Sequence, residues 1–178
     1  MILGLDISTS ITGITLLTNS GERVYTGYCD TRKEKSFFKK GDKIRDELRK
    51  IINLCDGDSM ERIERVYVEE SLQMFHSGKS SAKVLASLTA INKLVSYFTY
   101  DELGIEPEFL MAVSARKAIG IKVPRGEKAK KVVLQFLLDN EEGFEVEYTA
   151  HGNPKAPFYD MADSIVIARA GLLSWRSE

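Results

Sequence analysis

The chain has 178 residues and a mass of 20.0 kDa, which predicts a single domain spanning residues 1–178 that buries about 70% of its unfolded surface. Its composition, 43% hydrophobic and 29% charged residues, excludes disordered and fibrous proteins. The 25 basic and 26 acidic residues give a formal net charge of −1, whereas nucleic-acid-binding domains are commonly basic overall.

The charges are nevertheless segregated along the chain. Residues 32–50 hold nine basic and four acidic side chains, and residues 114–131 hold seven basic side chains and one acidic one. Residues 139–147 hold five acidic side chains and no basic one. Clusters of one sign predict local basic surfaces that the neutral total conceals.

The sequence lacks the features of membrane and disulfide-rich proteins. No apolar run reaches the ~18 to 20 residues that cross a bilayer, and Asp6 interrupts the uncharged stretch that a signal peptide requires. We therefore expect a soluble cytoplasmic protein with no membrane partner. Cys29 and Cys55 are too few for a disulfide framework or a cysteine zinc site, so we expect reduced, half-buried packing residues.

Three short strands are predicted at the start of the chain. Residues 2–7 are an apolar run bounded by serine and threonine, and residues 11–18 are rich in β-branched types. Residues 24–29 form a third run after the turn at 19–21. Three successive strands with tight links predict an antiparallel meander.

Helices and strands alternate in the middle of the chain. A helix is predicted at 36–54, because apolar residues recur there at helical spacing, at Ile44, Leu48, Ile51, Ile52 and Cys55. Residues 65–70 read as a fourth strand, and a long helix follows at 80–98. A fifth strand is predicted at 108–113, after a crossover long enough for parallel pairing.

The last third is predicted to be helical. A basic connection at 114–127 leads into a helix that carries Val132, Val133, Phe136 and Leu137. An acidic loop at 140–157 precedes a final helix at about 159–174, which is apolar nearly all round and therefore buried. The order βββαβαβαα predicts an α/β domain with a mixed sheet and helices on both faces.

Acidic residues stand out in these apolar elements. Asp6 lies in the first buried strand, Glu69 and Glu70 end the fourth, and Asp160 and Asp163 share one face of the last helix. A buried carboxylate needs a cation, a hydrogen bond or a proton. If the first and fourth strands are neighbours, these side chains meet at the edge of the sheet. An all-oxygen cluster suits Mg²⁺ or Mn²⁺, and two such ions ~3.5 to 4 Å apart hydrolyse phosphodiesters.

Each acid also has a structural interpretation. Asp6 alone fits a hydrogen-bonded strand residue, and one of Glu69 and Glu70 faces solvent because neighbouring strand residues alternate between faces. Asp160 fits a helix N-terminal charge, and Asp163 a satisfied polar group in a buried helix. The joint pattern, more than any single acid, favours nuclease chemistry.

Three motifs resemble the RuvC-type Holliday junction resolvases of the RNase H-like superfamily: ILGLDISTSITG at 2–13, VYVE at 66–69 and DMADSIVIA at 160–168. The resemblance covers most of the chain in the same order. It implies an RNase H-like, mixed five-stranded sheet, with three antiparallel strands and then two parallel ones, and helices on both faces. It also implies a metal-dependent endonuclease that leaves 5′-phosphate and 3′-hydroxyl ends.

The resemblance assigns roles to particular residues. Asp6, Glu69, Asp160 and Asp163 correspond to four metal-binding carboxylates that hold two Mg²⁺ or Mn²⁺ ions, and Glu70 is then a neighbour. The family places lysines near the phosphates, which here correspond to Lys128 and, with a small shift in spacing, to Lys117. Solvated surface charge is the alternative for both lysines.

The implied partners are branched DNA, in particular a four-way junction, and a second copy of the chain. The stretches 32–50 and 114–131 are candidate DNA surfaces. The family forms its homodimer partly through its long central helix, here 80–98, although core packing alone also explains this helix.

The chain departs from the family at several positions. Ile7 and Ser8 stand where the family has Pro-Gly, which affects the turn after the first acid. The aromatic that opens a junction falls at Leu72, although Met74 or Phe75 could act as the wedge. His76 and His151 have no matched role. This divergence from the bacterial pattern favours a phage source.

Three other functions fit parts of the sequence. GLDISTS at 4–10 also resembles the first phosphate loop of sugar kinases and actin-like ATPases, but those proteins enclose a nucleotide between two such domains. A nuclease acting on replication forks or RNA would share the fold. A binding module that has lost catalysis is disfavoured by four retained carboxylates.

Overall fold

The computed structural model describes residues 1–55, 62–71 and 82–177. The positions of Leu72, Met74, Phe75 and His76 lie outside the described residues. The strands are β1 (Ile2–Asp6), β2 (Ile11–Leu17), β3 (Arg23–Asp30), β4 (Arg65–Glu69) and β5 (Glu108–Leu110). The helices are α1 (Phe37–Leu54), α2 (Ala82–Leu103), α3 (Ala112–Ala118), α4 (Ala129–Asn140) and α5 (Pro157–Trp175).

Within the described residues the strands form one five-stranded sheet with the order β3-β2-β1-β4-β5. β1, β2 and β3 pair antiparallel, whereas β1 pairs with β4, and β4 with β5, in parallel. The predicted fold class is therefore confirmed. β1 and β4 are neighbours, so the ends of these two strands meet at the same edge of the sheet.

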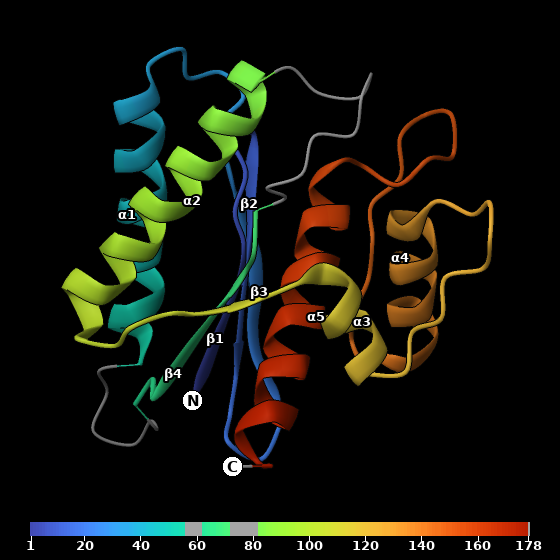
Figure 1. Ribbon diagram of the computed structural model, residues 1–178. Coiled ribbons are helices and arrows are strands. Elements are labelled where there is room, and N and C mark those ends of the chain that lie inside the picture. The colour runs from blue at the N-terminus through green and yellow to red at the C-terminus, as the bar shows by residue number, and fades with distance from the viewer. Residues whose placement is uncertain (56–61, 72–81, 178) are drawn as a thin grey trace.

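Helices cover both faces of the sheet (Figure 1): α1 and α2 lie on one side, and α3, α4 and α5 on the other. Strand alternation explains the two cores. Leu3 and Leu5 of β1 pack with Ile44 of α1 in one core. Ile2 of β1 and Tyr67 of β4 belong to the other core, which contains α5. Asp6 lies an even number of residues after Ile2, and Glu69 an even number after Tyr67. Both side chains are therefore on the face of the sheet that α5 covers.

The structure corrects the prediction between β5 and α4. The fifth strand ends at Leu110 instead of Val113, and α3 occupies part of the expected connection. Met111 and Val113 are 60% and 73% exposed, so burial does not hold them in the sheet. The segment Ala112–Ala118 is rich in alanine, arginine and lysine, which have high helix propensity.

Two further details differ from the predictions. α2 continues beyond Phe98 to Leu103, and Gly104 with φ +69° follows its end, as is common after helices. Cys29 and Cys55 are not joined in a disulfide, and both are buried, whereas half-buried residues were predicted.

Ser8 builds the turn between β1 and β2. Its Oγ donates to the carbonyl of Ile11 at 2.7 Å and accepts from the backbone N–H groups of Ser10 and Ile11 at 3.2 and 3.1 Å. The hydrogen bonds of a serine side chain thus close the turn at the position where the resemblance predicts Pro-Gly. This turn follows Asp6 directly.

Among the helices of the described ranges, none combines the length and apolar character needed to cross a bilayer.

Candidate active site

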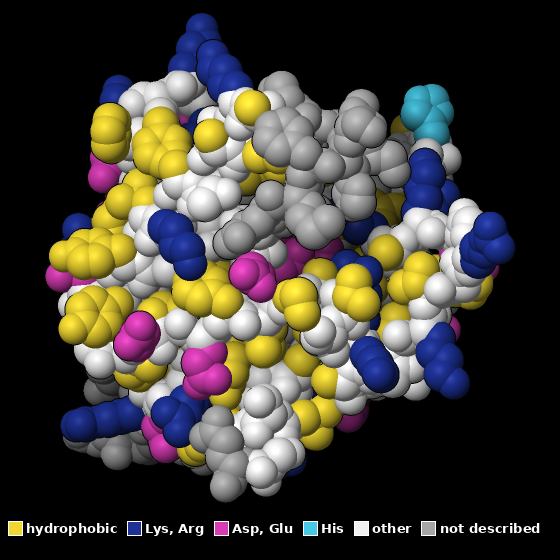
Figure 2. All heavy atoms as spheres, in the orientation of Figure 1, with side chains coloured by type: hydrophobic (Ala, Val, Ile, Leu, Met, Phe, Trp, Pro, Cys, Tyr) yellow, Lys and Arg dark blue, Asp and Glu magenta, His cyan; other side chains and the backbone are white. Residues whose placement is uncertain are grey.

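Three carboxylates converge where β1 and β4 end against α5. One oxygen each of Asp6, Glu69 and Asp163 lies within 4.8 Å of the others. Asp6 is 9% exposed and Asp163 is 6% exposed, so these are buried acids. Acidic side chains gather near the centre of the face in Figure 2, with a basic side chain beside them. Residues that are 157 positions apart in the sequence therefore share one site.

Close packing of α5 on the sheet creates this convergence. A β-carbon on Gly13 of β2 would lie 2.0 Å from the backbone oxygen of Asp160, and one on Gly4 of β1 would lie 2.6 Å from the backbone nitrogen of Ala168. Glycine at both positions lets the helix backbone approach the strands. The hydroxyls of Thr15 and Ser164 also lie 2.8 Å apart across this contact.

β4 and α2 together place Glu69. Strand alternation turns its side chain toward α5, and Asn92 of α2 donates its Nδ2–H to the Glu69 carbonyl at 2.9 Å. Glu70 lies beyond the end of β4, where its N–H donates to the carbonyl of Leu110. Glu69, and not its neighbour Glu70, belongs to the group of three carboxylates.

Asp160 lies one turn before Asp163 on α5, outside the group of three. Lys130 of α4 donates from its Nζ to Asp160 Oδ1 at 3.0 Å and lies 3.6 Å from Asp163 Oδ2. The side chain of Lys130 is 56% exposed, whereas that of Asp160 is 15% exposed. The two aspartates of the last motif are thus joined by one lysine at the rim of the site.

Sequence reasoning missed Lys130 and Arg116, two cations of the described ranges that act on the carboxylates. Lys128 is the exposed N-cap residue of α4 and Lys117 is exposed on α3, whereas Lys130 pairs with the acids. Arg116, next to Lys117, is half-buried, and its charge lowers the pKa of Glu69 and Asp163.

A sequence signal for Lys130 did exist. It precedes the buried residues Val133, Leu134 and Leu137 by three, four and seven residues, so it lies on the side of α4 that packs against α5, although its own side chain is largely exposed. Arg116 follows the buried Ala115 on α3, but its direction is defined only once α3 docks against α5. His151 is exposed in the loop before α5.

The acids repel one another in a partly dry environment. Burial, followed by the charges of Glu69 and Asp163, raises the pKa of Asp6 well above its ordinary value. Burial and the charge of Asp163 raise the pKa of Glu69 from 4.5 to about 7. Burial opposes the charged form of Lys130, but the attraction of Asp160, Asp6 and Asp163 outweighs it and raises the pKa of the lysine.

This donor set fits a hard divalent cation. It consists of carboxylate oxygens, which Mg²⁺ and Mn²⁺ prefer. Burial is the main cause of the raised pKa values of Asp6, Glu69 and Asp163, and the charges of neighbouring acids add to it, while the charge of Lys130 lowers all three. A divalent cation among these oxygens would supply the missing positive charge.

Comparisons with known proteins agree with this arrangement at the level of the fold. No protein-family model and no curated protein sequence matches the chain. RuvC of T. thermophilus in complex with a Holliday junction substrate has a TM-score of 0.68 at 14% identity, covering 99% of this chain and 94% of that one. A second structure of Thermus thermophilus RuvC has a TM-score of 0.62 at 17% identity, with 99% and 95% covered.

A eukaryotic structure is also similar. The yeast mitochondrial Holliday junction resolvase Ydc2 has a TM-score of 0.50 at 17% identity, covering 99% of this chain and 78% of that one. The described sheet order and the helices on both faces match this group. The chain therefore has the RNase H-like fold of the RuvC resolvases.

Proposed function

We propose that this protein is a structure-selective endonuclease that hydrolyses phosphodiester bonds in branched DNA, above all in four-way junctions. The observation that carries the proposal is the convergence of Asp6, Glu69 and Asp163, from three elements, within 4.8 Å of one another. The likeness of the fold to that of junction resolvases supports the choice of substrate.

The proposed roles follow from position and burial. Asp6 and Glu69 would hold two Mg²⁺ or Mn²⁺ ions, with Asp163 and Asp160 completing the set of ligands and orienting a water molecule. The ions, when bound, supply a water of lowered pKa and stabilise the leaving oxygen. The buried carboxylates are rigidly placed by β1, β4 and α5, so they are preorganised for this task.

Basic residues would receive the DNA around the carboxylates. Lys130 is half-exposed beside Asp160, where its ammonium group can meet a phosphate that enters the site. Lys128 and Lys117 point into solvent on neighbouring helices and remain candidates for phosphate contacts farther along the strand. Contacts of this kind position the DNA without reading its sequence, so binding should weaken steeply with salt.

The ATPase alternative is less well supported. A phosphate loop at the β1–β2 turn would offer free backbone N–H groups to a nucleotide. Here the N–H groups of Ser10 and Ile11 are already bound by the Oγ of Ser8. The turn is closed on itself, which argues against phosphate binding by its backbone.

Two symmetric cuts across a junction require two active sites, so we include a two-fold homodimer in the proposal. The described part of the long central helix offers a solvent-facing row on α2 made of Ala86, Ala90, Lys93, Tyr97 and Tyr100. Tyr97 and Tyr100 are 57% and 51% exposed, an apolar area that a second copy would cover. A cytoplasmic location is part of the same proposal.

The decisive experiment compares substrates. The purified protein with Mg²⁺ is given a synthetic four-way junction, a flap, a linear duplex and an RNA–DNA hybrid of matched sequence. Selective cleavage of the junction is expected, and preferred cleavage of the hybrid would move the substrate class to RNA. Asp6→Asn should abolish cleavage but retain junction binding, with Glu70→Gln as an active control. An unaltered rate in Asp6→Asn would remove Asp6 from the mechanism.

A further inference from the structure

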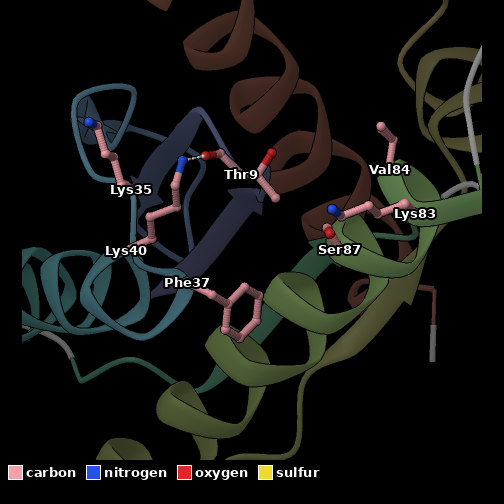
Figure 3. Close-up of a pocket in the computed structure, with 7 residues that line it drawn as sticks. All are labelled: Thr9, Lys35, Phe37, Lys40, Lys83, Val84 and Ser87. Carbon is pink, nitrogen blue, oxygen red and sulfur yellow. Dashed lines mark hydrogen bonds between the residues drawn. The ribbon is translucent and has the colours of Figure 1, made fainter.

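A basic pocket of about 320 Å³ opens between the first two helices, apart from the cluster of acids. Its lining residues are Thr9, Lys35, Phe37, Lys40, Lys83, Val84 and Ser87. In Figure 3 the three lysines come from two sides, from the segment around the start of α1 and from α2, with Thr9 between them. No carboxylate is among these described lining residues. The pocket is therefore suited to an anion.

The packing of α1 against α2 explains the opening. A β-carbon on Gly41 would lie 2.8 Å from Cδ2 of Leu94, so the helices are in close contact one turn into α1. Farther along α1, Arg45 and Arg49 bind Glu102 at 2.7 and 2.8 Å. Both helices begin at the end of the pair that holds the pocket (Figure 1), and the helix N-termini add partial positive charge there.

The pocket and the carboxylates are formed by parts of the same loop and the same helix. Thr9 follows Asp6 by three residues, and its carbonyl accepts hydrogen bonds from Lys40 Nζ and from Thr31 Oγ1. On the other side, Ser87 lines the pocket, while Asn92, five residues farther along α2, binds the Glu69 carbonyl. One loop and one helix thus connect the two sites.

The lysines are available to a ligand. Neither Lys35 nor Lys83 forms an ion pair with any acid in the described part of the chain, and both side chains are exposed. Lys40 donates from its Nζ to the carbonyl of Thr9, which is neutral, so this hydrogen bond leaves the positive charge of Lys40 uncompensated. Three cations around one cavity are an arrangement that a phosphate group stabilises.

We infer that this pocket binds a backbone phosphate of the DNA strand that passes the carboxylates, with the attached nucleoside against Phe37. The inference rests on the proposed nuclease function. A volume of about 320 Å³ suits a nucleotide-sized unit and not a duplex. Phe37 lines the pocket between α1 and α2 (Figure 3) and is only partly buried against the core, so a sugar or base can pack on the part of its side chain that faces the pocket. The pocket then directs an unpaired or branching strand away from the acids.

The test removes two pocket charges without touching the loop after Asp6. Lys35→Gln/Lys83→Gln is compared with Arg62→Gln/Arg176→Gln, whose exposed residues lie at the opposite end of the sheet. Binding of a fluorescent four-way junction is measured by anisotropy in EDTA over a series of KCl concentrations. Each lost phosphate contact makes the slope of log K against log [KCl] less steep by ~0.7 to 0.9.

The pocket variant should lose ~0.7 to 0.9 from this slope, because one phosphate contact is lost, whereas the control should keep the slope of the unaltered protein. Equal slopes for the two variants would overturn the inference, because diffuse charge would then explain binding. Binding of free dTMP that depends on Lys35 and Lys83 but does not weaken junction binding would also overturn it. Failure of the unaltered protein to cleave branched DNA would refute the nuclease proposal. The binding measurement in EDTA would still test the pocket, because it does not depend on cleavage.

Discussion

The backbone carbonyl of Asp160 packs directly against Gly13, where a β-carbon would lie 2.0 Å from the carbonyl oxygen. This contact joins the last helix to the middle of the sheet at the level of Asp6, because Asp6 pairs with Gly13 in the sheet register. The position of the acids on α5 relative to the acids of β1 and β4 thus depends in part on the absence of a side chain at Gly13.

Gly13→Ala should displace the start of α5 from the sheet. Since the atoms that the new β-carbon would meet belong to the backbone of Asp160 and Met161, they cannot rotate away, and we expect a loss of stability of about 1 to 3 kcal/mol. A displacement near 1 Å should lower junction cleavage by roughly 100-fold. Urea denaturation and single-turnover cleavage measure the two effects. Full activity in Gly13→Ala would show that the active geometry tolerates a shift of α5.

Glu69→Gln and Glu70→Gln form a matched pair of adjacent substitutions. Because Glu69 belongs to the buried group of carboxylates, Glu69→Gln should lower Mg²⁺-dependent cleavage by at least ~100-fold, a loss of several kcal/mol of charge stabilisation. Glu70→Gln should cleave at the normal rate. Equal activity of the two variants would contradict the assignment of Glu69.

The same pair predicts a change of stability with pH. The pKa of Glu69 is about 7 in the fold against an ordinary 4.5, so the folded state holds this proton more tightly than the unfolded state. Its contribution to stability is therefore present below pH 4.5 and is lost as the pH rises toward 7. In EDTA at pH 8, Glu69→Gln should melt ~2 to 4 °C higher than the unaltered protein. A lower melting temperature at pH 8 would contradict this sign.

Magnesium should relieve the repulsion among the acids. In a thermal melt at pH 8, Mg²⁺ at a hundredfold excess over its Kd should stabilise the unaltered protein by about 2.7 kcal/mol. Asp6→Asn should show little of this shift, while Glu70→Gln should show all of it. A shift of equal size in Asp6→Asn would place the bound ion elsewhere.

Lys130→Met and Lys128→Met separate the two lysines on α4. Lys130 pairs with Asp160 and Asp163, but its side chain is 56% exposed and therefore screened by water. We expect Lys130→Met to cost only about 0.5 to 1 kcal/mol in EDTA at pH 8. The cost should become smaller as the pH falls toward 4, because Asp163, whose pKa is raised by burial, is then protonated. Lys128→Met should be neutral at both pH values, and a larger loss for Lys128→Met would contradict the structural assignment.

Tyr97→Glu/Tyr100→Glu tests the proposed dimer. Light scattering should report about twice 20.0 kDa for the unaltered protein and 20.0 kDa for this variant, since two charges cannot be buried in an apolar interface without partners. Tyr148→Glu is the control, because Tyr148 is 53% exposed on the loop before α5. A monomeric unaltered protein at the concentrations used for cleavage would refute the dimer.

Much of the fold follows from local patterns. The β-branched and apolar runs of β1 to β4 and the helical spacing in α1 indicate their elements within windows of a few residues. The segment Ala112–Ala118 was not predicted as a helix, because its first two residues were assigned to the fifth strand and the rest to a basic connection. The exposure of Met111 and Val113 explains why the strand ends early.

The sequence by itself was enough to identify the acidic candidates for the site and the strands and helix that carry them, because a carboxylate in an apolar strand or helix stands out within a few residues of sequence. Helical spacing places Lys130 on one side of α4, but only the tertiary structure decided which acids Lys130 and Arg116 act on, and that Lys35, Lys40 and Lys83 surround one pocket. A surface cation has no local pattern that states its partner. Its role depends on how α3 and α4 dock on α5 and how α1 meets α2, which is set by packing between residues far apart in the chain.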